Sequence, residues 1–98
     1  MSFLLENVSV DTTGAGIQGD GGNKGISIYA TSFGSGNVSL EISPDEGTTW
    51  INVPYNGVPS AFTTNVDLLL LTLRQEWIIR AKLTGSSGAS GVNVKLVK

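Results

Sequence analysis

The sequence lacks two residue types that carry much of protein chemistry, since its 98 residues include no cysteine and no histidine. Without cysteine there is neither a disulfide nor a thiolate metal site. Without histidine the chain lacks the commonest metal ligand and the commonest general base. We therefore expect no bound metal and no cofactor. A chain of this length is expected to build one core, and so a single domain over residues 1–98.

Charge is also scarce: charged residues make up 14% of the chain, and the formal net charge is −2. No basic patch is available to displace counterions from phosphates, so we expect no nucleic acid partner. The longest apolar run, residues 68–71, is far too short to cross a bilayer, so no membrane is expected either. The first ten residues, MSFLLENVSV, lack the positive segment and long apolar core of a secretory signal, so we expect the chain to be made in the cytoplasm.

Apolar residues instead alternate with polar ones along most of the chain, with the period of two that is typical of β-strands. The clearest alternating segments are residues 25–32 (GISIYATS), 37–43 (NVSLEIS), 77–83 (WIIRAKL) and 92–96 (VNVKL). No window carries a helical stripe. The pattern predicts an all-β fold, a small β-sandwich or jelly-roll-like domain of seven to eight short antiparallel strands.

Thirteen glycines mark the turns between these segments. The stretches SFGSGN (residues 32–37) and TGSSGASG (residues 84–91) are both predicted to be hairpin loops. Residues 11–25 form the longest polar, glycine-rich break, which we interpret as a flexible loop and not as a calcium or nucleotide site.

Residues 43–50 (SPDEGTTW) match the pattern S-x-D-x-G-x-T-W, the Asp-box that recurs in sialidases and related β-propellers. In that motif a carboxylate bonds the amides of its own turn, a glycine takes an unusual conformation and a tryptophan packs beneath. A propeller needs at least about four blades of about forty residues each, which this chain cannot supply. The motif therefore predicts a structural turn, formed by Ser43, Asp45, Gly47, Thr49 and Trp50.

No catalytic residues are expected elsewhere. Glycoside hydrolysis needs two carboxylates that face each other across a cleft, and Glu41 and Asp45 each have an ordinary solvated interpretation. A carbohydrate-binding module is the alternative that stays open, because Trp50, Tyr55 and Trp77 with Tyr29 would offer aromatic rings for sugars. Of these, Tyr55 in a loop is the ring most readily exposed.

Alternation fails in residues 66–73 (VDLLLLTL), which are apolar on both faces of the expected strand. A strand that is apolar on both faces must be covered on both faces. In a small sandwich the second cover is expected to be another copy of the chain, although a strand that bends at a bulge is the alternative. The candidate subunit contacts are Leu69, Leu71, Leu73 and Ile78.

Taken together, GSGNVSLEISPDEGTTWINV, the leucine-rich segment and WIIRAKLTGSSGASGVNVKLV make residues 25–98 resemble small virion proteins of tailed bacteriophages. That resemblance implies a capsid decoration (cement) protein that binds the major capsid protein on the capsid surface, often as a trimer. A tail or fibre component is the alternative within the same family. Residues 1–24 lie outside the resemblance, and we expect them to form a looser N-terminal attachment segment.

Overall fold

The protein is described here from a computed structural model that covers residues 2–19, 21–55 and 57–97. Eleven strands are assigned within these residues: β1 (Ser2–Val8), β2 (Thr12–Thr13), β3 (Ile17–Gln18), β4 (Asn23–Tyr29), β5 (Asn37–Ser43), β6 (Ile51–Asn52), β7 (Pro54–Tyr55), β8 (Val58–Pro59), β9 (Val66–Thr72), β10 (Ile78–Thr84) and β11 (Val92–Val97). Four of the long strands, β4, β5, β10 and β11, lie largely within the alternating segments of the sequence, since alternation lets a strand bury one face and hydrate the other.

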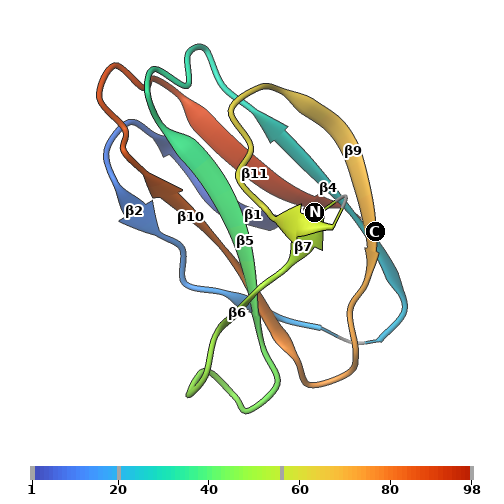
Figure 1. Cartoon of the computed structure of the whole chain (residues 1–98). Coiled ribbons are helices and arrows are strands. Elements are labelled where there is room, and N and C mark those ends of the chain that lie inside the picture. Colours follow the sequence, from blue (N-terminus) through green and yellow to red (C-terminus); the bar gives the residue numbers. More distant parts are fainter. Residues whose placement is uncertain (1, 20, 56, 98) are drawn as a thin grey trace.

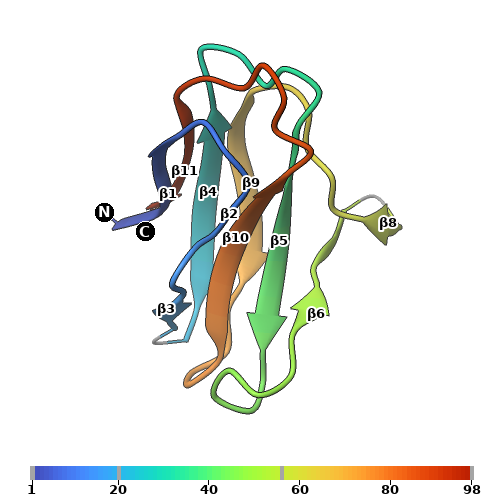
Figure 2. The ribbon, with the colours of Figure 1, turned by 90° about the vertical axis from the view of Figure 1, so that its left-hand side faces the viewer.

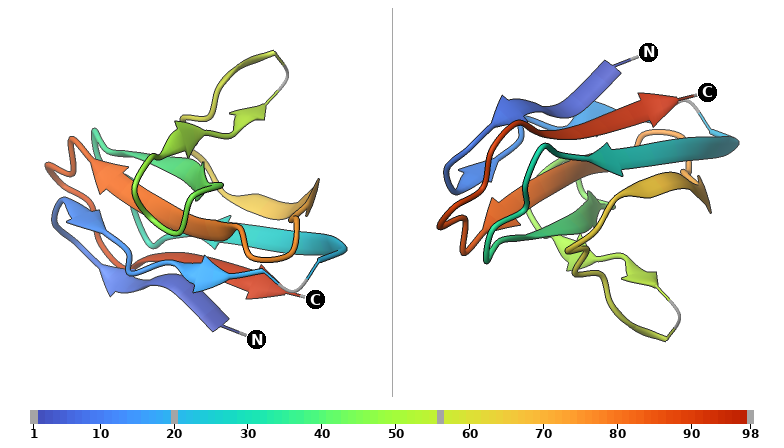
Figure 3. Two further views of the ribbon diagram at one scale, coloured as in Figure 1. Left: turned by 90° about the horizontal axis from the view of Figure 1, so that it is seen from below. Right: turned by 90° about the horizontal axis from the view of Figure 1, so that it is seen from above.

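The strands form two sheets that pack face to face (Figures 1 and 2). Sheet A has the order β1-β11-β4-β9, and sheet B has the order β2-β10-β5-β6, with β3 also paired to β10. When β2 and β3 are taken as one broken strand, each sheet has four strands. The chain then crosses from one sheet to the other at every connection except the one from β5 to β6, as in a jelly roll. The predicted all-β sandwich is confirmed. The extra short strands arise because β2 and β3 are separate pieces and because β7 and β8 form a small hairpin that projects from the body (Figure 3).

The core lies between the sheets and is made of the residues that the alternation placed inward. Fully buried members come from both layers: Ile26, Ile28, Val92 and Val94 from sheet A, and Val38, Leu40, Ile79, Ala81 and Leu83 from sheet B. The β10–β5 register sets Ala81 opposite Leu40 and Leu83 opposite Val38, so these side chains share one face of sheet B. Burial of these side chains is the main favourable contribution to the fold.

The N-terminal segment is part of this sandwich, which corrects the expectation that residues 1–24 form a looser attachment segment. Strand β1 pairs with β11, and β2 and β3 pair with β10. Leu4 and Leu5 are both buried, although they are adjacent in sequence, because the β1–β11 register shifts between Phe3 and Leu5. A bulge of this kind turns two successive side chains towards the core, which a strict period of two does not anticipate.

The two predicted hairpin loops are instead connections between the sheets. Residues 32–37 lead from β4 in sheet A to β5 in sheet B, and residues 84–91 lead from β10 in sheet B to β11 in sheet A. The two loops pack on each other: the Ser35 amide donates to the Ser87 carbonyl over 2.9 Å, and the Ser35 hydroxyl donates to the Gly85 carbonyl over 2.8 Å. Glycine-rich turn chemistry is the same in a hairpin and in such a connection, so the sequence could not distinguish them.

Candidate functional site

The Asp-box turn follows β5, and hydrogen bonds within eight residues hold it. The Ser43 hydroxyl accepts a hydrogen bond from the Gly47 amide over 2.7 Å and donates one to Asp45 Oδ1 over 2.9 Å. The same Asp45 oxygen accepts a hydrogen bond from the Thr49 amide over 2.7 Å. Glu46 and Gly47 both have positive φ, 61° and 96°, which places the glycine where a side chain would be strained. The turn thus satisfies its own backbone donors.

Trp50 closes this turn and covers part of the outer face of sheet B. Its indole Nε1 donates to the Gly47 carbonyl over 3.1 Å. The Arg80 guanidinium carbon lies 3.8 Å from the ring centroid, and Arg80 Nε donates to Glu41 Oε1 over 2.8 Å. Arg80 and Glu41 are directly opposite in the β10–β5 register. The arginine is therefore held between an aromatic face and a carboxylate, and the five motif residues lie together as a structural element.

Ser43→Ala tests the turn, because Ser43 is fully buried and its hydroxyl accepts from the Gly47 amide. Removal of the hydroxyl leaves that donor without its acceptor, and we expect a loss of about 1–3 kcal/mol in the free energy of unfolding. Urea denaturation followed by tryptophan fluorescence measures it. Ser39→Ala, on the same strand and the same sheet face, is the control and is expected to change stability by less than about 0.5 kcal/mol. Equal effects of the two variants would contradict the hydrogen-bonding role.

Two aspartates have lowered pKa values for reasons that the geometry explains. The Thr49 amide, with smaller contributions from the Thr49 and Ser43 hydroxyls, holds the pKa of Asp45 below its usual 3.8. Hydrogen bonds from the Ser86 hydroxyl and, to a smaller extent, from the Ser86 amide lower the pKa of Asp11. Asp11 thereby ties the loop after β1 to the loop before β11, a role that sequence reasoning missed because the partners are 75 positions apart.

Acid pH is expected to weaken the fold through these two groups. A carboxyl whose pKa is lower in the folded state contributes stability above its unfolded pKa, about 3.9, and loses it as the pH falls through the folded pKa. Tm should therefore decline below about pH 4. The double variant Asp11→Asn, Asp45→Asn should decline less steeply than the wild type over the same range in a series of thermal melts. An identical acid slope in both proteins would show that these bonds do not stabilise the fold.

The two candidate catalytic acids interact with other groups, since Glu41 is paired with Arg80 and Asp45 with its own turn. Within residues 2–19, 21–55 and 57–97, no group of three acidic side chains lies close enough to hold a metal ion. The aromatic rings of the candidate sugar-binding platform lie apart. Trp50 is on the outer face of sheet B, Trp77 is half-buried against the core, and Tyr29 is in sheet A. The side chain of Tyr55 lies outside the described residues.

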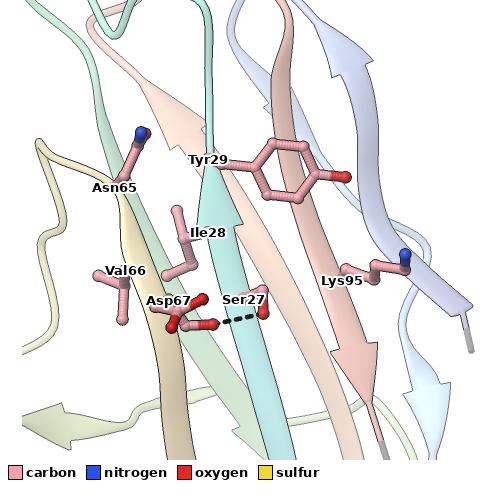
Figure 4. A pocket seen from close by; sticks show the side chains of 7 residues that line it. All are labelled: Ser27, Ile28, Tyr29, Asn65, Val66, Asp67 and Lys95. Atoms are coloured by element: carbon pink, nitrogen blue, oxygen red, sulfur yellow. Dashed lines mark hydrogen bonds between the residues drawn. The ribbon is translucent and has the colours of Figure 1, made fainter.

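A hollow of about 460 Å³ lies on the outer face of sheet A (Figure 4). It is lined by Ser27, Ile28, Tyr29, Asn65, Val66, Asp67 and Lys95. The Tyr29 side chain is 39% exposed, and the Asn65 amide oxygen accepts a hydrogen bond from the Ala30 amide over 3.2 Å. The hollow forms where β4 and β9 shift register between Ile26 and Ile28. The residues come from β4, β9 and β11 and from Asn65 just before β9, so no local signal in the sequence marks them.

The leucines of β9 that face solvent are not the ones that the sequence analysis assigned to self-association. Leu73 is 0% exposed, and Leu69 and Leu71 are half-buried against the core, whereas Leu68 is 55% and Leu70 is 70% exposed. The assignment of Leu69, Leu71 and Leu73 to a subunit contact is therefore corrected: they pack within their own chain. Leu69 faces inward because the β4–β9 register sets it opposite the buried Ile26.

Ile78 belongs to a different surface. It lies on β10 in sheet B and pairs with Gln18 and Ser43, and its Cγ2 lies 2.8 Å from the position that a Cβ at Gly16 would occupy. It is half-buried within its own chain and is separated from the exposed leucines by the thickness of the sandwich. Ile78 and β9 therefore do not form one contact surface. The exposed apolar residues of β9 are Leu68 and Leu70.

Comparison of the chain with protein-family models, with curated proteins and with solved structures found no match. The part of the chain that the structure describes contains no helix of the length and apolar character needed to cross a membrane.

Proposed function

We propose that this chain is a non-catalytic structural protein of a bacteriophage virion, and specifically a decoration protein that binds the assembled capsid and stabilises it. The observation that carries the proposal is the edge of sheet A, where β9 presents Leu68 and Leu70 to solvent. Exposed leucines on an edge strand favour contact with another protein chain. The jelly-roll strand order, which occurs in viral capsid domains among others, supports the same proposal.

Such a protein acts by binding and needs no reactive groups. If it binds only the assembled shell, it stabilises that shell by mass action. Many symmetric sites on one capsid multiply a modest affinity for each copy. The low share of charged residues, 14%, suits a surface that packs against the major capsid protein without large desolvation costs. In this role, each sandwich binds across neighbouring capsid subunits and opposes their separation.

Cryo-electron microscopy of the virion that encodes this chain tests the proposal. We expect density for the sandwich on the capsid exterior, together with earlier thermal opening of capsids that lack the protein. Density on the tail or on fibres would favour the alternative virion role and contradict decoration. Absence of the chain from purified virions would overturn both.

Carbohydrate binding is the second candidate function, and the hollow on sheet A favours it. Tyr29 offers a half-exposed ring for the apolar face of a sugar, and the Asp67 and Asn65 side chains offer polar groups at the rim. Saturable binding on a glycan panel that is lost in Tyr29→Ala and kept in Val58→Ala would support it. Val58 is an exposed apolar residue on the projecting β7–β8 hairpin, so it serves as the matched control. No binding to any glycan would remove this candidate.

A further inference from the structure

The hollow on the outer face of sheet A lies where the pairing of β4 with β9 is interrupted. The register shifts just after Ile26, and two side-chain hydrogen bonds bridge the two segments there. The Ser27 hydroxyl donates to the Asp67 carbonyl over 2.6 Å, and the Asn65 amide oxygen accepts from the Ala30 amide over 3.2 Å. Bulges recur next to active sites because they re-aim side chains. The hollow is therefore a preformed feature that specific bonds hold in place.

Opposite charges stand on the two sides of this hollow without pairing with each other. Asp67 lies on β9 and Lys95 on β11, and Ser27 on β4 lies between them (Figure 4). Among the described residues, the Asp67 carboxylate takes part in no hydrogen bond or ion pair. The Lys95 Nζ lies 5.6 Å from the centroid of the Phe3 ring and has no carboxylate partner in the described part of the chain. Both charged groups can therefore bond to a ligand.

Tyr29 supplies an apolar surface among these polar groups. Its ring is exposed, and Figure 4 shows the side chain extending from β4 towards the neighbouring β11. The Asn65 amide nitrogen and the Lys95 amine are donors, and the Asp67 carboxylate is an acceptor. This set complements hydroxyl groups, which both donate and accept. The hollow volume of about 460 Å³ falls within the range of about 300–1,000 Å³ that is typical of small-ligand sites.

The two charges also select among sugars. A sugar that carries a single charge can pair with one of the two groups only by placing that charge in the same hollow as the other group, which has the like sign. Like charges set close together and stripped of water are a common means of rejecting a ligand. An uncharged sugar avoids this cost, and its hydroxyls can bond to both groups at once.

We propose that this hollow binds the ring of an uncharged pyranose sugar. The ring stacks on Tyr29, and its hydroxyls donate to the Asp67 carboxylate on one side and accept from the Lys95 amine on the other. The inference rests on carbohydrate binding, the second candidate function above, and adds the class of sugar and the residues that select it. It does not depend on capsid decoration.

An NMR titration of the isotope-labelled full chain tests the site. The probes are the methyl glycosides of glucose, galactose and mannose, each compared with its uronic acid and its 2-amino counterpart. We expect saturable shifts of the backbone amide signals of Ser27, Tyr29 and Asp67 with an uncharged glycoside. Its two charged counterparts should bind at least about tenfold more weakly, because each meets a like charge. Tyr29→Ala should abolish the binding.

Variants that remove one charge each test the selection. Asp67→Asn should weaken the uncharged glycoside at least about fivefold, because a charged acceptor becomes a neutral one, and should narrow its preference over the uronic acid. Lys95→Met, which keeps an unbranched stem, should narrow the preference over the amino sugar. Glu76→Gln is the control, since it removes a negative charge from an exposed side chain outside the hollow. It should change neither affinity nor preference.

The spectrum of each variant also shows whether the variant is folded, so loss of binding is separated from loss of structure. Shifts confined to other parts of the chain would overturn the proposed site. Charged glycosides that bind in the hollow as tightly as uncharged ones would overturn the selection and leave carbohydrate binding standing. No shift with any probe would overturn the inference, and the glycan panel described above then decides separately whether carbohydrate binding stands.

Discussion

Leu73→Ala is expected to lower the free energy of unfolding by about 2–5 kcal/mol, the usual cost when a buried leucine is cut back to alanine. Leu73 is 0% exposed and follows β9 directly, and its Cγ lies 2.6 Å from the position that a Cβ at Gly19 would occupy. The glycine thus lets the leucine pack closely against the segment after β3. Removal of three carbon atoms leaves a cavity between the sheets that the close-packed surroundings refill only in part. Urea denaturation followed by tryptophan fluorescence measures the loss.

Leu70→Ala is the matched control for that result, because it makes the same chemical change three residues earlier in the same segment. Leu70 is 70% exposed, so the expected change in unfolding free energy is less than about 0.5 kcal/mol. The pair of variants compares the two faces of one leucine-rich strand. A large loss of unfolding free energy in Leu70→Ala together with a small loss in Leu73→Ala would contradict the inward and outward faces described above.

Gly34→Ala is expected to destabilise the fold by a similar amount, about 2–5 kcal/mol, for a different reason. Gly34 has φ 58°, a conformation that costs an alanine about 1–2 kcal/mol. A Cβ there would also lie 2.3 Å from the Ser87 carbonyl oxygen and 2.6 Å from the Ala89 amide nitrogen. Since both are backbone atoms, the connection between β4 and β5 must move away from the connection between β10 and β11. Overpacking of this kind costs a further amount of about 1–3 kcal/mol, as in tightly packed cores.

Gly88→Ala separates the two contributions. Gly88 lies in the same pair of loops and also has positive φ, 80°, but a Cβ there would meet the nearest atom, the Gly34 Cα, at an ordinary 3.6 Å. Its expected cost is therefore the conformational part alone, about 1–2 kcal/mol. Thermal melts of both variants and the wild type make the comparison. If the two substitutions destabilise the fold equally, that result would contradict the close packing of the two loops around Gly34.

The features that the sequence predicted correctly depend on neighbours along the chain. A period of two is a local property, so it identified the strands around Leu40, Ile79 and Val94 and placed these side chains in the core. The Asp-box turn is equally local, because the bonds between Ser43, Asp45 and Gly47 span at most four positions. Such features can be predicted without knowing to which sheet the strand belongs.

Pairing between distant segments decided the rest. Residues 32–37 and 84–91 have the composition of hairpin loops, yet each crosses between sheets, because β4 pairs with β11 and β9 and not with β5. The bond from Asp11 to Ser86 and the hollow beside Tyr29 likewise join residues that the chain keeps far apart. Backbone hydrogen bonds are alike in every strand, so local composition does not select the partner.

The leucine-rich strand separates the two kinds of information most clearly. By itself, the amino-acid sequence determined that residues 66–73 form a strand too apolar for one buried face, and that a charged residue stands near each end. Only the tertiary structure decided which leucines face inward, because an unbroken run of leucines has no polar residue to mark the solvent side. The register with β4, which sets Leu69 opposite Ile26, turned Leu68 and Leu70 outward and so decided which face of the edge can meet a partner.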